Sequence, residues 1–303
     1  MLLNFTFIGL MAPVFTIFDK DSSINTEKIP NYANYLSESG IHGILVHGTS
    51  GEATSLSVRE RKDLAQAWSE TVKNTSQHLM VQVGGCPLPD VLELAKHAEE
   101  IGADSILCMP ELYFKPKKPR DLINYLKHVS DAAPNTPLLY YHNPGHTGVN
   151  IDMAQFLEES TNQLPTLKGI KFTSNDLAAG YAALKAAGGR FTVFIGGDLL
   201  LAPAFALGFD SAIATSINIF PSYATGILEA VKMSDVAKAQ GLQENLTAAM
   251  KIIRSFGPKV PTTKVAMNYV SPINVGHARA PLENLSEEQS REMRLSLGGY
   301  LKY

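Results

Sequence analysis

The fold is decided by the stretch Leu167-Lys168-Gly169-Ile170-Lys171-Phe172-Thr173-Ser174-Asn175. Residues 169–173 are mostly apolar or β-branched and predict a short strand, and the polar residues 174–176 suit the start of a helix. Lys171 lies inside that strand, where alternation with solvent would not call for a cation. A buried lysine must lose its charge, find a partner or do chemistry. The alternative is an edge-strand lysine whose amine reaches water.

Outward from this stretch, short apolar runs alternate with amphipathic helical patterns. The helical patterns include 57–73, 88–101, 120–132 and 175–187, and glycines follow several of them. Eight runs have the length and composition of strands: 7–13, 43–46, 79–84, 105–109, 138–142, 169–173, 191–196 and 211–215.

Eight strand–helix units favour a closed (β/α)8 TIM barrel, an α/β fold with parallel strands. No G-x-G-x-x-G follows the first strand, which counts against an open dinucleotide-binding sheet. We expect residues 1–232 to form the barrel that carries the active site. Three further helical patterns, at about 234–256, 262–269 and 286–300, predict a C-terminal helical extension over 233–303 that packs on the barrel.

Composition limits the classes of partner. The chain has 303 residues, of which 45% are hydrophobic and 18% charged, so it can bury a large core. A net charge of −3 without a basic run speaks against nucleic acid, and no run of about 20 apolar residues suggests a membrane span. The apolar residues 1–18 have no basic start, so we interpret them as a first strand and not a signal peptide. Cys86 and Cys108 form no disulfide framework, which favours a reducing, cytoplasmic location.

Candidate site residues follow the strands at their carboxyl ends, where barrels carry their chemistry. After the second strand comes His47-Gly48-Thr49-Ser50-Gly51-Glu52, whose N–H groups and hydroxyls can hold an anion, although an ordinary turn is the alternative. Tyr141 lies 30 residues before Lys171, which is one strand–helix unit. The two side chains should therefore lie at similar height on adjacent strands, about 4.8 Å apart. An amine beside a phenol, facing an anion-binding loop, suits Schiff-base chemistry on a 2-oxo acid.

These motifs carry a family resemblance. Gly48-Thr49-Ser50-Gly51-Glu52, Tyr141-x-x-Pro144 with Thr147-Gly148, and Gly169-Ile170-Lys171 resemble the N-acetylneuraminate lyase and dihydrodipicolinate synthase superfamily of class I aldolases. The resemblance covers essentially the whole chain. It is strongest to the animal N-acetylneuraminate lyase branch, which Tyr140-Tyr141-His142, Thr147-Gly148-Val149 and Lys264 resemble.

The resemblance implies a reaction and roles for residues. Lys171 would form an iminium with the substrate ketone, and Tyr141 would relay the proton as N-acetylneuraminate is cleaved reversibly to N-acetylmannosamine and pyruvate. It also implies that no metal or organic cofactor is required, and that the protein is a homotetramer in which Tyr113 lies near a neighbouring subunit's site. The substrate-binding residues it implies are Thr49 and Ser50 for the carboxylate, and Thr173, Gly197, Asp198 and Thr215 for the remainder.

Two departures from the family pattern concern the sugar end. Leu199 follows Asp198 where the family has a glutamate, and Ile217 stands where the family has a tyrosine. A site that loses a hydrogen-bonding group discriminates differently between substrates. The acceptor could therefore differ, as in another sialic acid or a 2-keto-3-deoxy sugar acid. A histidine, His146, stands where dihydrodipicolinate synthases have an arginine, which disfavours that activity.

Three further alternatives remain open at the level of sequence. A barrel that kept the pocket and lost turnover would be a non-catalytic sialic-acid binder. His47, His142 and His146 all fall near strand ends and could in principle bind zinc in a metal-dependent aldolase, although loop histidines are more often hydrogen-bonding residues. Glu52 we interpret as structural, closing its loop by capping the next helix.

Overall fold

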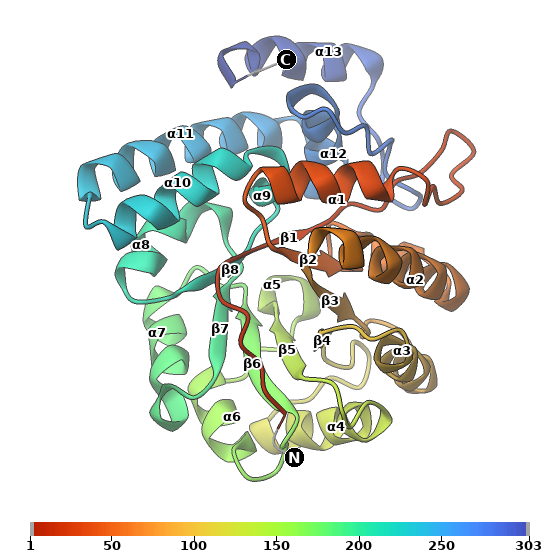
Figure 1. Cartoon of the computed structure of the whole chain (residues 1–303), viewed down its shortest axis with the longest axis vertical. Coiled ribbons are helices and arrows are strands. Elements are labelled where there is room, and N and C mark those ends of the chain that lie inside the picture. Colours follow the sequence, from red (N-terminus) through yellow and green to blue (C-terminus); the bar gives the residue numbers. More distant parts are fainter. Residues whose placement is uncertain (1–2, 301–303) are drawn as a thin grey trace.

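Eight parallel strands form a closed barrel in the computed structural model, which describes residues 3–300 (Figure 1). Each strand pairs with its neighbour in sequence, and β1 pairs with β8 to close the ring. The prediction of a (β/α)8 barrel is confirmed. The strands are β1 (Leu10–Pro13), β2 (Gly43–Val46), β3 (His78–Gln82), β4 (Ser105–Cys108), β5 (Leu138–His142), β6 (Leu167–Phe172), β7 (Thr192–Ile195) and β8 (Ser211–Ile213).

Helices surround this barrel (Figure 1). The larger ones are α1 (Ile29–Glu38), α2 (Val58–Thr75), α3 (Leu88–Glu100), α4 (Pro119–Ala132), α6 (Met153–Ser160), α7 (Leu177–Lys185), α8 (Leu201–Ala206) and α10 (Pro221–Lys232). Short helices α5 (Pro144–Thr147) and α9 (Ser216–Ile219) follow β5 and β8, and 3-10 turns lie at Ala53–Ser55, Ala186–Gly189, Asp198–Leu200 and Gly298–Tyr300. Local sequence determines where α2 begins: Ser57 and Glu60 form a reciprocal capping box at its N-terminus. Trp68, on the inner face of α2, is buried.

The C-terminal extension consists of α11 (Val236–Ser255), α12 (Lys259–Val270) and α13 (Glu287–Ser296), as expected. Figure 1 shows these helices together at one side of the barrel, with α11 beside α10. Helix α12 also contacts α9, which follows the last barrel strand. The extension therefore reaches the carboxyl end of β8.

Alternation along the strands divides the interior into two layers. On β5, Leu139 and Tyr141 point into the barrel, whereas Leu138 and Tyr140 join the larger core between strands and helices. On β6, Ile170 and Phe172 pack in that outer core. Because successive side chains alternate between faces, the odd-numbered residues of β6 after its initial bulge, from Gly169 on, face the barrel interior. Lys171 is one of them.

The first strand is shorter than its apolar run suggests. β1 begins at Leu10, not at residue 7, because Gly9 has φ 123°, a value open to glycine, and breaks the extended run. Phe5 and Phe7 instead pack on the inner layer near Phe194. In Figure 1 this N-terminal segment crosses the near end of the barrel. It closes the end opposite the candidate site.

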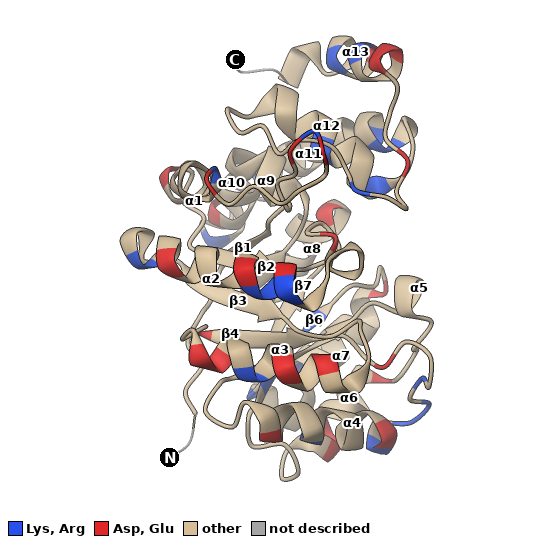
Figure 2. Ribbon diagram, turned by 90° about the vertical axis from the view of Figure 1, so that its right-hand side faces the viewer, with Lys and Arg blue, Asp and Glu red and all other residues tan. Residues whose placement is uncertain are grey.

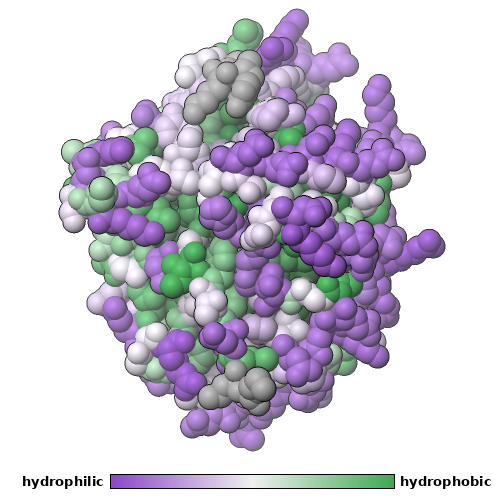
Figure 3. All heavy atoms as spheres, viewed as in Figure 1, coloured by the Kyte–Doolittle hydropathy of each residue, from purple (hydrophilic) through white to green (hydrophobic). Residues whose placement is uncertain are grey.

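The outer surface is mixed in charge and polarity. Figure 2 shows acidic and basic residues interspersed over the helices, without one large patch of a single sign. On the face shown in Figure 3, hydrophilic side chains dominate the margin, with hydrophobic ones between them toward the middle. Within residues 3–300, no helix combines the length and the apolarity needed to cross a bilayer.

Candidate active site

Lys171 and Tyr141 are direct neighbours across the β5–β6 ladder, as predicted. Their Cα atoms are partners in the register, and the Lys171 Nζ lies 4.1 Å from the centroid of the Tyr141 ring. Lys171 is 4% exposed and Tyr141 3% exposed, so neither group reaches bulk water. The edge-strand interpretation of the lysine is therefore wrong.

Burial sets the protonation of this pair. Loss of solvent is the largest cause that lowers the pKa of Lys171, and the nearby Lys259 cation lowers it further, against the opposing effect of Tyr141. Burial would raise the pKa of Tyr141, but the Lys171 amine and the Thr49 hydroxyl outweigh it, so that this pKa lies below its ordinary value. Burial thus favours a neutral, nucleophilic amine on Lys171, and the lowered pKa of Tyr141 gives a phenol that exchanges its proton readily.

The loop after β2 places two hydroxyls against this pair. Backbone bonds from Gly51 N–H to Gly48 O (3.0 Å) and from Glu52 N–H to Thr49 O (3.2 Å) close a tight turn. The Thr49 Oγ1 lies 3.1 Å from the Tyr141 hydroxyl. The Ser50 Oγ lies 3.0 Å from the Thr215 Oγ1. The predicted anion-binding loop and the predicted amine therefore face the same space.

That space is a small cavity at the carboxyl ends of the strands. It brings together six of the residues predicted from sequence to bind or react with substrate, and adds others from β1, β8, α12 and the segments that follow β5 and β7. Its lining consists of Pro13, Thr49, Ser50, Tyr141, Asn143, His146, Lys171, Thr173, Gly196, Ile213, Thr215 and Lys259. No acidic side chain is among these described lining residues.

Thr173 and Asp198 have contrasting positions. The Thr173 Oγ1 is buried and, within residues 3–300, has no hydrogen-bond partner, so it is available to a substrate hydroxyl. Asp198 and Gly197 do not line the cavity. The Asp198 carboxylate accepts from the Ser216 N–H (2.8 Å) and pairs with Arg254. Asp198 thus holds the N-terminus of α9 and not that of its own helical turn.

Three cavity or near-cavity residues escaped prediction from sequence: Asn143, Arg254 and Lys259. The Asn143 Nδ2 donates to the Tyr141 hydroxyl at 3.4 Å, and Arg254 neutralises Asp198. Lys259 is the first residue of α12, where a cation opposes the helix dipole. This unfavourable placement of a cation is the one sequence feature that could have pointed to Lys259 as a site residue. Within residues 3–300, its amine has no hydrogen-bond or ion-pair partner.

The three candidate histidines do not converge. Within residues 3–300, no three His, Cys, Asp or Glu side chains are grouped so that they could hold a metal ion. His47 is buried, which lowers its pKa well below the ordinary value. His142 stacks on Phe172 at 4.8 Å, and burial lowers its pKa to about 4. Only His146 lines the cavity, with its Nδ1 3.3 Å from the Asn143 Oδ1.

Leu199 and Ile217, the two departures at the sugar end, lie outside the lining. Ile217 is fully buried in the outer core, and Leu199 packs partly buried against the same core. Tyr113 is 84% exposed on the loop between β4 and α4, with its ring edge-on to Phe114 at 5.0 Å. Glu52 is structural, but its carboxylate does not cap a helix: it accepts from Lys264 Nζ at 2.7 Å and from the Arg279 N–H at 2.8 Å.

Comparison with known proteins agrees with this geometry. Residues 6–298 match the Dihydrodipicolinate synthetase family. The chain belongs to this family. Among curated relatives, mouse N-acetylneuraminate lyase is 34% identical over 92% of this chain and 88% of its own length, and the human N-acetylneuraminate lyase is 34% identical over 97% and 93%.

Solved structures of the Dihydrodipicolinate synthetase fold superpose closely. N-acetylneuraminate lyase from Aliivibrio salmonicida gives a TM-score of 0.93 with 34% identity and covers 98% of both chains. The Proteus mirabilis N-acetylneuraminate lyase gives 0.92 with 30% identity and covers 97% of this chain and 99% of its own. The similarity spans barrel and extension alike.

Proposed function

We propose that this protein is a Schiff-base aldolase that cleaves N-acetylneuraminate reversibly to N-acetylmannosamine and pyruvate. The observation that carries the proposal is the direct pairing of Lys171 with Tyr141 inside the barrel, with both side chains shielded from water. The names of the most similar relatives support the choice of substrate.

The proposed reaction assigns one role to each group of the pair. The neutral Lys171 amine attacks C2 of the open-chain substrate, water leaves, and the resulting iminium accepts the electron pair of the C3–C4 bond. Tyr141, through the substrate carboxylate, relays the proton that the C4 hydroxyl loses as that bond breaks. The enamine left on Lys171 takes up a proton at C3, and water releases it as pyruvate. These steps need no oxidant or reductant.

Binding roles are assigned to the lining hydroxyls. Thr49 and Ser50 hold the pyruvoyl carboxylate, Thr173 offers its unpartnered hydroxyl to the sugar, and Thr215 supports Ser50. Gly197 and Asp198 remain predictions for the polyol tail, and Asp198 would have to exchange its present partners to reach it.

A second candidate substrate is favoured by one observation. Since the described lining carries no carboxylate, the cavity holds no acid to accept hydrogen bonds from a polyol tail. A different sialic acid or a 2-keto-3-deoxy sugar acid would be cleaved by the same amine and phenol.

Assembly and location are part of the proposal. The aromatic pair formed by Tyr113 and Phe114 is more than four-fifths exposed on both residues, which suits a contact with another subunit of a homotetramer. We place the protein in the cytoplasm because both of its cysteines, Cys86 and Cys108, are free thiols.

Pyruvate release from a panel of sialic acids and 2-keto-3-deoxy acids tests the substrate. We expect release from N-acetylneuraminate by the parent chain and none by Lys171→Met. Release only from a simpler acid would refute the substrate and keep the mechanism. Binding of sialic acid without release from any acid would instead identify a non-catalytic binder.

A further inference from the structure

Glu52, next to the candidate site, is unusual in its backbone conformation and in its burial. It has φ 54°, a left-handed backbone that non-glycine residues rarely adopt, and its side chain is fully buried. A buried carboxylate is stable only when paired and hydrogen-bonded. Glu52 lies two residues after Ser50, so the residues that pair with its carboxylate also influence the position of the loop that carries Ser50.

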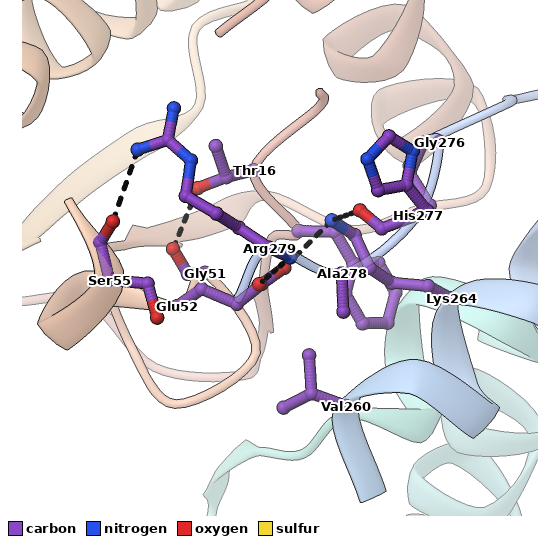
Figure 4. A network of polar contacts seen from close by, with 12 residues as sticks. Thr16, Gly51, Glu52, Ser55, Val260, Lys264, Gly276, His277, Ala278 and Arg279 are labelled. Carbon is purple, nitrogen blue, oxygen red and sulfur yellow. Dashed lines mark hydrogen bonds and ion pairs between the residues drawn. The ribbon is translucent and has the colours of Figure 1, made fainter. Parts of the chain in front are cut away.

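The partners of Glu52 come from the C-terminal extension, more than 200 positions away. Lys264 on α12 is also fully buried, and its Nζ donates to the Glu52 Oε1 and to the carbonyl of His277, both at 2.7 Å. The Glu52 Oε2 accepts from the Arg279 N–H at 2.8 Å. In Figure 4 the Lys264 amine lies between the Glu52 carboxylate and the His277 carbonyl, and the Arg279 backbone N–H meets the same carboxylate. Both carboxylate oxygens are therefore held by the extension.

Arg279 fixes the same loop at a second point. Its guanidinium donates to the Ser55 carbonyl at 3.0 Å, at the far end of the loop (Figure 4). It also pairs with Glu60 at the start of α2. From the barrel side, the Thr16 hydroxyl donates to the Gly51 carbonyl at 2.7 Å. The loop is thus held from outside the cavity along its length.

The backbone of this loop connects Glu52 to the residues that line the cavity. The Glu52 N–H donates to the Thr49 carbonyl, and the Thr49 hydroxyl contacts the phenol of Tyr141. A shift of Glu52 would therefore move the two hydroxyls that face the cavity. Misplacement of a binding group by about 1 Å costs on the order of a hundredfold in such sites.

We propose that Lys264 and Arg279 of the C-terminal extension are positioning residues for the substrate carboxylate: through Glu52, they hold the Thr49–Ser50 turn in its binding geometry. The inference rests on the proposed function, because it assigns the turn to the carboxylate of a 2-oxo acid. It makes the extension a part of the active site and not only a cover for the barrel.

The test compares two ketones that react with the same amine. Reduction with borohydride traps the iminium of pyruvate, which carries a carboxylate, and that of acetone, which carries none. For Lys264→Met we expect pyruvate trapping relative to acetone trapping to fall roughly tenfold to a hundredfold, through a higher half-saturating pyruvate concentration. Loss of general stability would lower both reactions equally.

Two further variants keep the test decisive. If Lys264→Met fails to fold because Glu52 is left unpaired, the double variant Glu52→Gln with Lys264→Met removes both buried charges, and the same fall in the ratio is expected. The matched control is Ser286→Ala, which removes the N-terminal cap of α13 within the extension, a hydrogen bond from the Gln289 N–H, and touches neither the turn nor the residues that hold Glu52. Its ratio should equal that of the parent.

The outcomes separate two failures. A parent chain that traps acetone and pyruvate, with a folded variant whose ratio is unchanged, overturns the positioning role alone. An equal fall in Ser286→Ala overturns it as well. A parent chain that traps neither ketone overturns the proposed function, and the positioning role with it.

Discussion

Removing the phenol oxygen with Tyr141→Phe separates the two halves of the proposed reaction. The ring stays in place, so no cavity forms, and the hydroxyl loses its contacts with Thr49 (3.1 Å) and Asn143 (3.4 Å) and its interaction with the Lys171 amine. Two neutral hydrogen bonds contribute about 0.5–1.5 kcal/mol each, and the fold should survive. A positioned proton-transfer group contributes about 10²–10⁴ in rate, or roughly 3–5 kcal/mol of barrier. The kinetic effect should therefore far exceed the effect on stability.

Schiff-base formation should persist in the same variant. Tyr141 opposes the lowering of the pKa of Lys171, so its loss leaves the amine more readily neutral. We expect full trapping of pyruvate by borohydride at saturation, with kcat for cleavage of N-acetylneuraminate reduced by about 10²–10⁴. A kcat within threefold of the parent would refute the proton-relay role of Tyr141. Loss of trapping in a folded variant would show that the phenol acts on the earlier step.

Three other changes test single contacts. Burial is the main cause that lowers the pKa of Lys171, and the Lys259 cation lowers it further. In Lys259→Met the pKa of Lys171 should therefore rise, and the acidic limb of the pH–rate profile should move to higher pH; an unmoved limb contradicts this. Hydrogen bonds from Arg279 lower the pKa of Glu60 to about 2, so this pair adds stability above pH 4.5 that is lost as the pH falls toward 2. In acid unfolding, Arg279→Gln should remove that dependence, and parallel curves would argue against it. Gly169→Ala places a Cβ 2.1 Å from the Thr192 carbonyl oxygen of β7, so the free energy of unfolding should fall by roughly 1–3 kcal/mol in a denaturant titration. A value equal to that of the parent would contradict the close approach of the two strands.

Periodicity and unit length were enough to predict the barrel and its central pair. Residues 141 and 171 stand at equivalent positions of consecutive strand–helix units, and parallel strands preserve height from one unit to the next. The alternation of side chains then sends both groups inward. The pairing of Tyr141 with Lys171 and the inward direction of both side chains therefore follow from local sequence.

The remaining contacts depend on long-range pairing, which local patterns do not contain. Asp198 meets Arg254 across 56 positions, and Glu52 meets Lys264 across 212. From sequence, Asp198 was expected to meet substrate and Glu52 to cap a helix, since each choice is reasonable for an acid in a loop. The cations of the extension, Arg254 on α11 and Lys264 on α12, determine both positions, and these contacts form only when α11 and α12 pack against the barrel.

The most direct test of the central claim is reduction of the protein with borohydride in the presence of pyruvate, followed by mapping of the modified peptide. Lys259 and Lys264, both near the site, serve as internal controls. The account predicts one reduced pyruvate adduct, carried by Lys171 and absent from Lys171→Met. An adduct on another lysine, or none on the parent chain, would contradict it.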